Sequence, residues 1–126
     1  MRTIKLIFLV SFVLFLGIAG SNVFATPYAS SPGPADGETD VAIETNLTWT
    51  RGDGAVADEV YFGTESPLPL VAVIPNTSPA LFDPGDPNLV ASTTYYWQIV
   101  EVIGLDRYEG PIWSFTTVSG LSLIHI

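Results

Sequence analysis

The sequence predicts an all-β fold, a seven-stranded antiparallel β-sandwich, and three observations lead to it. After Ala25, prolines and glycines are spread so densely that few stretches are long enough for a helix. Between these breakers lie short runs rich in β-branched and aromatic residues, with turn signals roughly every 8–12 residues. Within the runs, apolar and polar side chains alternate, which is the period of a strand with one buried face. Two such sheets would bury a shared core.

Seven runs qualify as strands, and they cover residues 28–31, 46–49, 59–62, 70–74, 80–82, 94–103 and 112–117. We expect the first at a sheet edge, because Pro32 and Pro34 lack the N–H group that a central strand needs. The second and third end at turn-forming residues, and the fourth lies between two prolines. A turn is expected over 104–110, between the longest run and the last one.

Alternation assigns each side chain of these runs to a face. The expected core set is Leu47, Trp49, Val60, Phe62, Tyr95, Trp97, Ile99, Trp113 and Phe115. The expected outward set is Thr48, Tyr96, Gln98 and Ser114. Glu101 falls on the inward side of its run. Since a buried, unpaired carboxylate is costly, Glu101 must be paired, at the rim, or displaced by a bulge.

Residues 1–25 have the order of a secretory signal peptide. Two cations, Arg2 and Lys5, precede an apolar run over 6–19, and Val23-Phe24-Ala25 offers small side chains for a signal peptidase. The run is shorter than the roughly 20 apolar residues of a spanning helix, which favours cleavage over a membrane anchor. We therefore expect a mature protein that is secreted or held at the cell surface, with a domain that is not membrane-embedded.

The rest of the chain divides into an N-terminal extension over 26–30, one domain over 31–117 and a terminal segment over 118–126. Val118-Ser119-Gly120 has the composition of a linker. We interpret 121–126 as a foreign tail, a translated sequencing adapter fused to a truncated frame, and a native apolar tail is the alternative. On this interpretation the chain is a fragment, and its expected partners are neighbouring domains of a longer protein.

The charge of the chain and its lack of cysteine limit which partners it can bind and how it can be stabilised. Cleavage after Ala25 removes two of the four cations and leaves two against thirteen acids, a formal charge of −11. Such a surface repels phosphate backbones, so no nucleic-acid partner is expected. The chain has no cysteine. Packing rather than disulfide bonds must therefore stabilise an exported domain.

Five segments together resemble a known family, and they are 32–37, 47–49, 60–64, 89–97 and 110–117. With them, residues 31–117 resemble a bacterial fibronectin type III-like domain, which is an immunoglobulin-like sandwich. The resemblance implies a tyrosine corner, because Leu89 and Tyr95 stand six apart, and the tyrosine hydroxyl would bond to the upstream backbone. Asp58 stands where similar sequences carry an aromatic residue. Gln98 and Val100 replace a basic and an acidic residue, so the outward face differs from the family's.

The residue types required for most catalysis are missing from the domain. His125 is the sole histidine, which excludes Ser-His-Asp and Cys-His catalysis and histidine zinc sites within the folded region. A carboxylate pair would suffice for glycoside hydrolysis, but a sandwich this small rarely holds the cleft for it. We predict that the protein is not an enzyme and has no catalytic residue and no cofactor.

Two acidic segments are candidates for calcium. Residues 83–88 lack the alternating ligands and closing glutamate of a calcium loop, and their prolines indicate a turn. Asp36, Glu38 and Asp40 alternate, but they precede a strand and are interpreted as a solvated loop. No metal site is predicted.

Two functions fit these observations. A site-free sandwich favours a spacer or adhesion module that makes protein–protein interactions within a larger exported protein. The alternative is a carbohydrate- or protein-binding module that uses exposed Tyr61, Tyr96 or Tyr108 as stacking platforms. A contiguous exposed aromatic patch would favour binding, whereas buried aromatics would favour the spacer.

Overall fold

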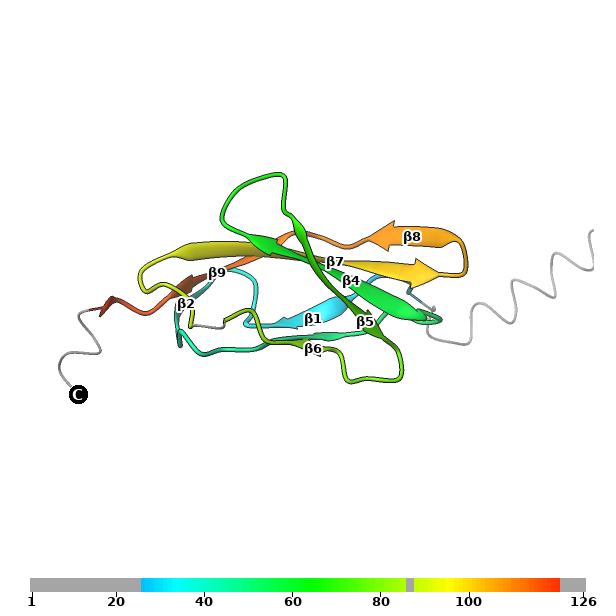
Figure 1. Ribbon diagram of the computed structural model, residues 1–126, viewed down its shortest axis with the longest axis horizontal. Helices are drawn as coiled ribbons and strands as arrows, with labels where there is room; N and C mark the ends of the chain where they lie inside the picture. The colour runs from blue at the N-terminus through cyan, green and yellow to red at the C-terminus, as the bar shows by residue number, and fades with distance from the viewer. Residues whose placement is uncertain (1–25, 86–87, 121–126) are drawn as a thin grey trace, which may run out of the picture.

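The structure is a computed structural model that describes residues 26–85 and 88–120. Within these residues two β-sheets face one another (Figure 1). The smaller sheet has the order β1-β3-β6, with strands β1 (Ser30–Gly33), β3 (Leu47–Thr50) and β6 (Leu81–Phe82). The larger has the order β2-β9-β7-β4-β5, with strands β2 (Glu38–Val41), β9 (Trp113–Thr117), β7 (Thr94–Ile103), β4 (Ala57–Gly63) and β5 (Leu70–Pro75). A sixth strand of this sheet, β8 (Asp106–Glu109), also pairs with β7. The protein is therefore an all-β sandwich, as predicted.

Each of the seven predicted runs overlaps a strand, and β1 lies at an edge as its prolines require. The prediction of a turn over 104–110 was wrong, because only the reversal at Gly104 is tight and residues 106–109 return along β7 as β8. The segment with Asp36, Glu38 and Asp40 was predicted to be a solvated loop. That prediction was wrong for two of the three residues, because Glu38 and Asp40 belong to strand β2. Strand β2 runs parallel to β9, so the expected antiparallel pairing fails at that one place.

The alternating faces were predicted correctly. Every member of the expected core set is buried or packs against the buried cluster, while Thr48 and Tyr96 are exposed. The larger sheet therefore has an inner face toward the core and an outer face toward solvent. Val100 and its ladder partner Glu59 are exceptions on the outer face, since both are buried.

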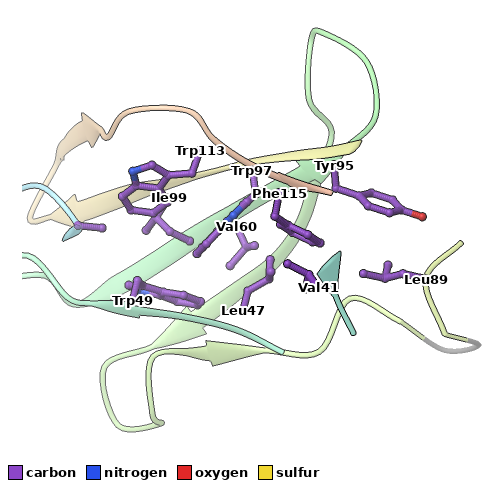
Figure 2. Packing of buried hydrophobic residues seen from close by; sticks show 11 residues of the cluster. Val41, Leu47, Trp49, Val60, Leu89, Tyr95, Trp97, Ile99, Trp113 and Phe115 are labelled. Carbon is purple, nitrogen blue, oxygen red and sulfur yellow. The ribbon is translucent and has the colours of Figure 1, made fainter. Parts of the chain in front are cut away.

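Trp97 lies at the centre of the core and is fully buried (Figure 2). Its ring meets Trp113 at 4.8 Å and Trp49 at 6.2 Å between centroids, both in the tilted geometry that aromatic quadrupoles favour. Trp49 comes from the smaller sheet, so this cluster joins the two layers. Truncating a buried tryptophan to alanine typically costs about 3–5 kcal/mol, which makes this contact a main source of stability.

A second aromatic stack stands at the opposite end of the core. Phe62, Tyr95 and Phe115 lie nearly parallel, with the Phe62 and Tyr95 rings 5.1 Å apart. The Tyr95 hydroxyl reaches beyond the core and accepts a hydrogen bond of 3.0 Å from the Val90 N–H. This is the contact that the spacing of Leu89 and Tyr95 implied, and Leu89 is buried beside it (Figure 2).

Residues 26–30 pack against the domain. Thr26 and Asp53 exchange hydrogen bonds, in which the Asp53 N–H donates to the Thr26 carbonyl at 2.8 Å. Ala29 is part of the core cluster. The described chain enters near the β7–β8 reversal and leaves from β9 at the other end of the long axis (Figure 1). Residues 1–25 and 121–126, the expected signal and tail, lie outside the described residues.

Replacing Tyr95 with phenylalanine tests the hydroxyl contact. Tyr95→Phe keeps the ring stack and removes only the acceptor for Val90, so we expect a loss of about 1 kcal/mol of unfolding free energy. Urea unfolding followed by tryptophan fluorescence measures it. Tyr96→Phe, on the exposed face of the same strand, is the matched control. Equal stability of the two variants would show that the hydroxyl contact contributes nothing.

Candidate functional site

The outer face of the larger sheet carries a hollow of about 650 Å³. Its floor consists of outward side chains of β4 and β7, namely Tyr61, Tyr96, Gln98 and Val100. The β4–β5 loop rises beyond the sheet on one side (Figure 1) and contributes residues 66–68. Arg107 and Glu109 of β8 and the exposed Ile112 complete it. We call this hollow the outer-face groove.

A charged network fixes part of the floor. Glu59 accepts hydrogen bonds from the Tyr61 hydroxyl at 3.3 Å and from Arg107 Nε at 3.0 Å. Glu59 and Tyr61 stand two apart on β4 and therefore share the outer face. Burial raises the pKa of Tyr61, and the charge and hydrogen bond of Glu59 raise it further. The phenol thus stays protonated and donates to the carboxylate.

Glycines shape the groove at two positions. Gly63 is the partner of Tyr96 on β4, so β4 places no side chain beside the Tyr96 ring, and the side chains of Leu68 and Pro69 pack against Gly63 instead. Gly110 separates β8 from β9, and its carbonyl accepts a hydrogen bond of 2.8 Å from Gln98 Nε2. A Cβ at Gly110 would meet the Ile99 carbonyl oxygen at 3.0 Å, so this approach favours glycine. The Gln98 amide is thereby held in one orientation.

Two of the three tyrosines proposed as stacking platforms meet in the groove, and the third does not. Tyr61 and Tyr96 occupy diagonal positions on β4 and β7. Tyr108 pairs with Glu101 across the ladder, so it stands on the other face of the sheet and packs edge-on against Tyr28 at 5.6 Å. Arg107 and Glu109 were not expected in a site, because the sequence interpretation treated their strand as a turn.

The inner face holds a second polar cluster. Asp58 and Glu101 are direct partners on β4 and β7, and both side chains are fully buried. Arg51 follows β3 and binds the Asp58 carboxylate through Nε at 2.8 and 2.9 Å, while its Nη1 donates to the Ser78 carbonyl. The Gly52 N–H donates to Glu101 Oε2. The sequence left Glu101 to be paired, at the rim or displaced by a bulge. The structure shows that it is buried and hydrogen-bonded.

This arrangement keeps a proton on Glu101 at neutral pH. Burial, and next the neighbouring Asp58 carboxyl, raise the pKa of Glu101 from its ordinary 4.5 to about 8, against the lowering effects of Gly52 and Arg51. Glu101 Oε2 accepts from the Gly52 N–H, and Oε1 is buried without a hydrogen-bond partner among the described residues. Asp58 raises the pKa of Arg51, so the cation persists. The cluster is a neutral acid, a carboxylate and a guanidinium that connect both sheets.

Gly52 has a steric role in the same cluster. A Cβ there would lie 2.1 Å from the Pro27 carbonyl oxygen, which is far inside contact distance. The backbone of residue 27 therefore passes directly over the loop that supplies the Glu101 hydrogen bond. Because Asp58 and Glu101 are fully buried on the inner face, we interpret the cluster as one that positions the β3–β4 connection rather than as a substrate site.

The described part of the chain contains no group of three or more potential metal-binding side chains. In the 83–88 segment, Asp83 Oδ1 accepts a hydrogen bond from the Gly85 N–H, which is the geometry of a turn. In the other acidic segment, Asp36 accepts from the Ser114 N–H and Glu38 from the Ala35 N–H. No helix in the described ranges is long and apolar enough to cross a membrane.

No protein-family model matches this chain, and no curated protein matches it. The groove and the buried cluster therefore have to be interpreted from their own geometry. Sequence signals for the buried cluster were present, because Asp58 and Glu101 each fall on inward positions. What the sequence does not give is the ladder register that makes them partners, or the position of Arg51 beside them.

Replacing Glu101 with glutamine tests the buried proton. Between pH 4.5 and about 8 the unfolded chain loses a proton that the folded chain retains, so wild-type stability should fall as pH rises through this window. Glu101→Gln mimics the protonated acid and cannot ionise. It should match the wild type near pH 4.5 and exceed it above pH 8 in urea unfolding.

Glu65→Gln, in the exposed β4–β5 loop, is the control and should follow the wild type at every pH. A parallel loss of stability in Glu101→Gln and the wild type would show that the pH dependence arises elsewhere.

Proposed function

We propose that this chain is a non-catalytic binding module of a larger exported protein and that it contacts its partner through the outer-face groove. The observation that carries the proposal is that the exposed Tyr96 and the half-buried Tyr61 line the same hollow of about 650 Å³. Small-molecule and polymer sites are concave, with apolar surface and a few polar groups that fix orientation. The groove has this composition.

The groove is built on a rigid support. Its floor side chains alternate along β4 and β7 with Val60, Trp97 and Ile99, which are fully buried. Side chains on packed strands lose little freedom when a ligand binds, because the scaffold has already ordered them. Tyrosines on packed strands therefore suit a binding function better than tyrosines on a loop would.

The family assignment belongs to the same proposal. A fibronectin type III-like, immunoglobulin-like sandwich is supported by the pairing of β1 with β3, the hairpin-rich larger sheet and the hydroxyl contact of Tyr95. The fold alone does not assign a ligand, because this sandwich supports many functions.

A spacer function is the second candidate, and one observation favours it. The described chain enters and leaves at opposite ends of the long axis (Figure 1), which suits domains joined in series. The two functions are compatible, since a module in a series can also present a binding face. They differ in whether removing the tyrosines changes binding.

Retention experiments decide between them. The exported chain is immobilised and exposed to cell-wall and extracellular material, separated into polysaccharide and protein fractions. We expect a component that the wild type retains and a Tyr61→Ala/Tyr96→Ala double variant does not. Tyr28→Ala removes an exposed tyrosine outside the groove and should retain it. If all three proteins retain a component equally, or if none retains any, the binding function through the groove is contradicted and only the spacer function remains.

Export is tested separately. Residues 1–30 fused to an alkaline phosphatase that is active only outside the cytoplasm should give activity, and the released protein should begin at Thr26 on N-terminal sequencing. Ala25→Arg places a large cation at the cleavage position and should leave the precursor uncut. A phosphatase that stays inactive would contradict export, and a fusion that remains membrane-bound would indicate an anchor.

A further inference from the structure

We propose that the outer-face groove binds a neutral saccharide chain. This inference rests on the proposed binding function and adds the chemical class of the ligand. It follows from three properties of the groove: the placement of its tyrosines, the hydrogen-bonding capacity that its own contacts leave open, and its charge.

The tyrosines provide a stacking surface. Tyr61 pairs with Gln98 and Gly63 pairs with Tyr96, so the two tyrosines are diagonal neighbours, whose separation in a ladder is about 7–8 Å. Tyr96 is 40% exposed, and its direct partners Gly63 and Ser114 are both small residues. Sugar rings present flat faces of C–H groups, and such faces pack against aromatic rings, whose faces carry negative charge.

The polar groups around the tyrosines retain unused capacity. Gln98 uses its Nε2 on the Gly110 carbonyl, which leaves the Oε1 of a fixed amide as an acceptor. Arg107 uses Nε on Glu59, and its side chain is 62% exposed, so its terminal amino groups are left as donors. Glu109 is exposed and adds a carboxylate. Neighbouring sugar hydroxyls, each a donor and an acceptor, match this combination of groups.

Charge disfavours anionic ligands. The groove is lined by Glu109 and by Arg107, whose charge is already matched by Glu59, within a mature chain of formal charge −11. Uronate, sulfate or phosphate polymers would therefore be repelled. A neutral chain avoids this cost.

The groove also disfavours an extended peptide. A peptide that binds a sheet as an added strand needs the free backbone groups of an edge. The groove floor is instead the face of β4 and β7, whose backbones pair with each other and with β5, β8 and β9. A ligand there can contact only side chains, which suits stacking and hydroxyl recognition.

Affinity electrophoresis and calorimetry test the proposal with the purified exported chain. The probes are neutral β-glucan, xylan, mannan and galactan with their hexasaccharides, an anionic arm of pectate and heparin, and a peptide arm of extended and proline-rich sequences. We expect at least one neutral glycan to bind. Tyr96→Ala should weaken it about tenfold or more, and Tyr96→Phe, which keeps the ring, should restore it.

Tyr28→Ala is the matched control and should bind as the wild type does, because Tyr28 stands outside the groove. Arg107→Gln should weaken binding of the same glycan, and its thermal unfolding is measured alongside because it also removes the partner of the buried Glu59 carboxylate. The Tyr28 and Tyr96 variants are both checked for wild-type tryptophan fluorescence, which reports an intact core.

The experiments distinguish a failure of the saccharide proposal from a failure of the proposed binding function. Binding confined to anionic polymers or peptides, and lost in Tyr96→Ala, would overturn the saccharide proposal and leave the binding function standing. Glycan binding that Tyr96→Ala does not change would overturn the assignment to this groove. The absence of binding by any probe, together with equal retention in the fractionation experiment, would overturn both.

Discussion

The contact of Trp97 with Trp49 joins the two sheets, and the rest of the structure depends on it. The chain has no cysteine, so no disulfide spans the layers. Trp97 projects from the central strand β7, is fully buried, and meets an indole from each layer. Because interiors are close-packed, the placement of this large side chain determines which residues can stand opposite it. The spacing between the layers, and with it the inner position of the remaining aromatics, follows from that single side chain.

The buried polar cluster closes one end of this core. Replacing such a cluster with apolar residues is often neutral for stability, so its presence is better explained by what it positions. Arg51 and Gly52 belong to the β3–β4 connection, whereas Asp58 and Glu101 belong to the larger sheet. The hydrogen bonds therefore hold the connection in one arrangement, and the segment at residue 27 packs against Gly52. An apolar end would provide burial without this directional restraint.

The same strand, β7, supports both the core and the groove. Its inward side chains include Trp97 and Ile99, and its outward ones include Tyr96 and Gln98. The interruption at Gly110 divides one side of β7 between β8 and β9, which both pair with it. This division brings Arg107 and Glu109 beside the tyrosines. Rigid packing on one face thus preorganises the polar and aromatic groups on the other, which lowers the ordering cost of binding.

The sequence by itself determined the all-β class, most strand positions and the two faces, because alternation with a period of two is a local property of each strand. It placed Trp49 and Trp97 in the core, implied the Tyr95 hydroxyl contact, and put Glu101 on the inward side. It did not reveal β2 or β8, because those polar strands depend on hydrogen bonds to neighbours far along the chain. The pairing of Asp58 with Glu101, and the meeting of Tyr61 with Tyr96 and Arg107, were decided only by the tertiary structure. Both follow from ladder register, which joins residues that no local pattern connects.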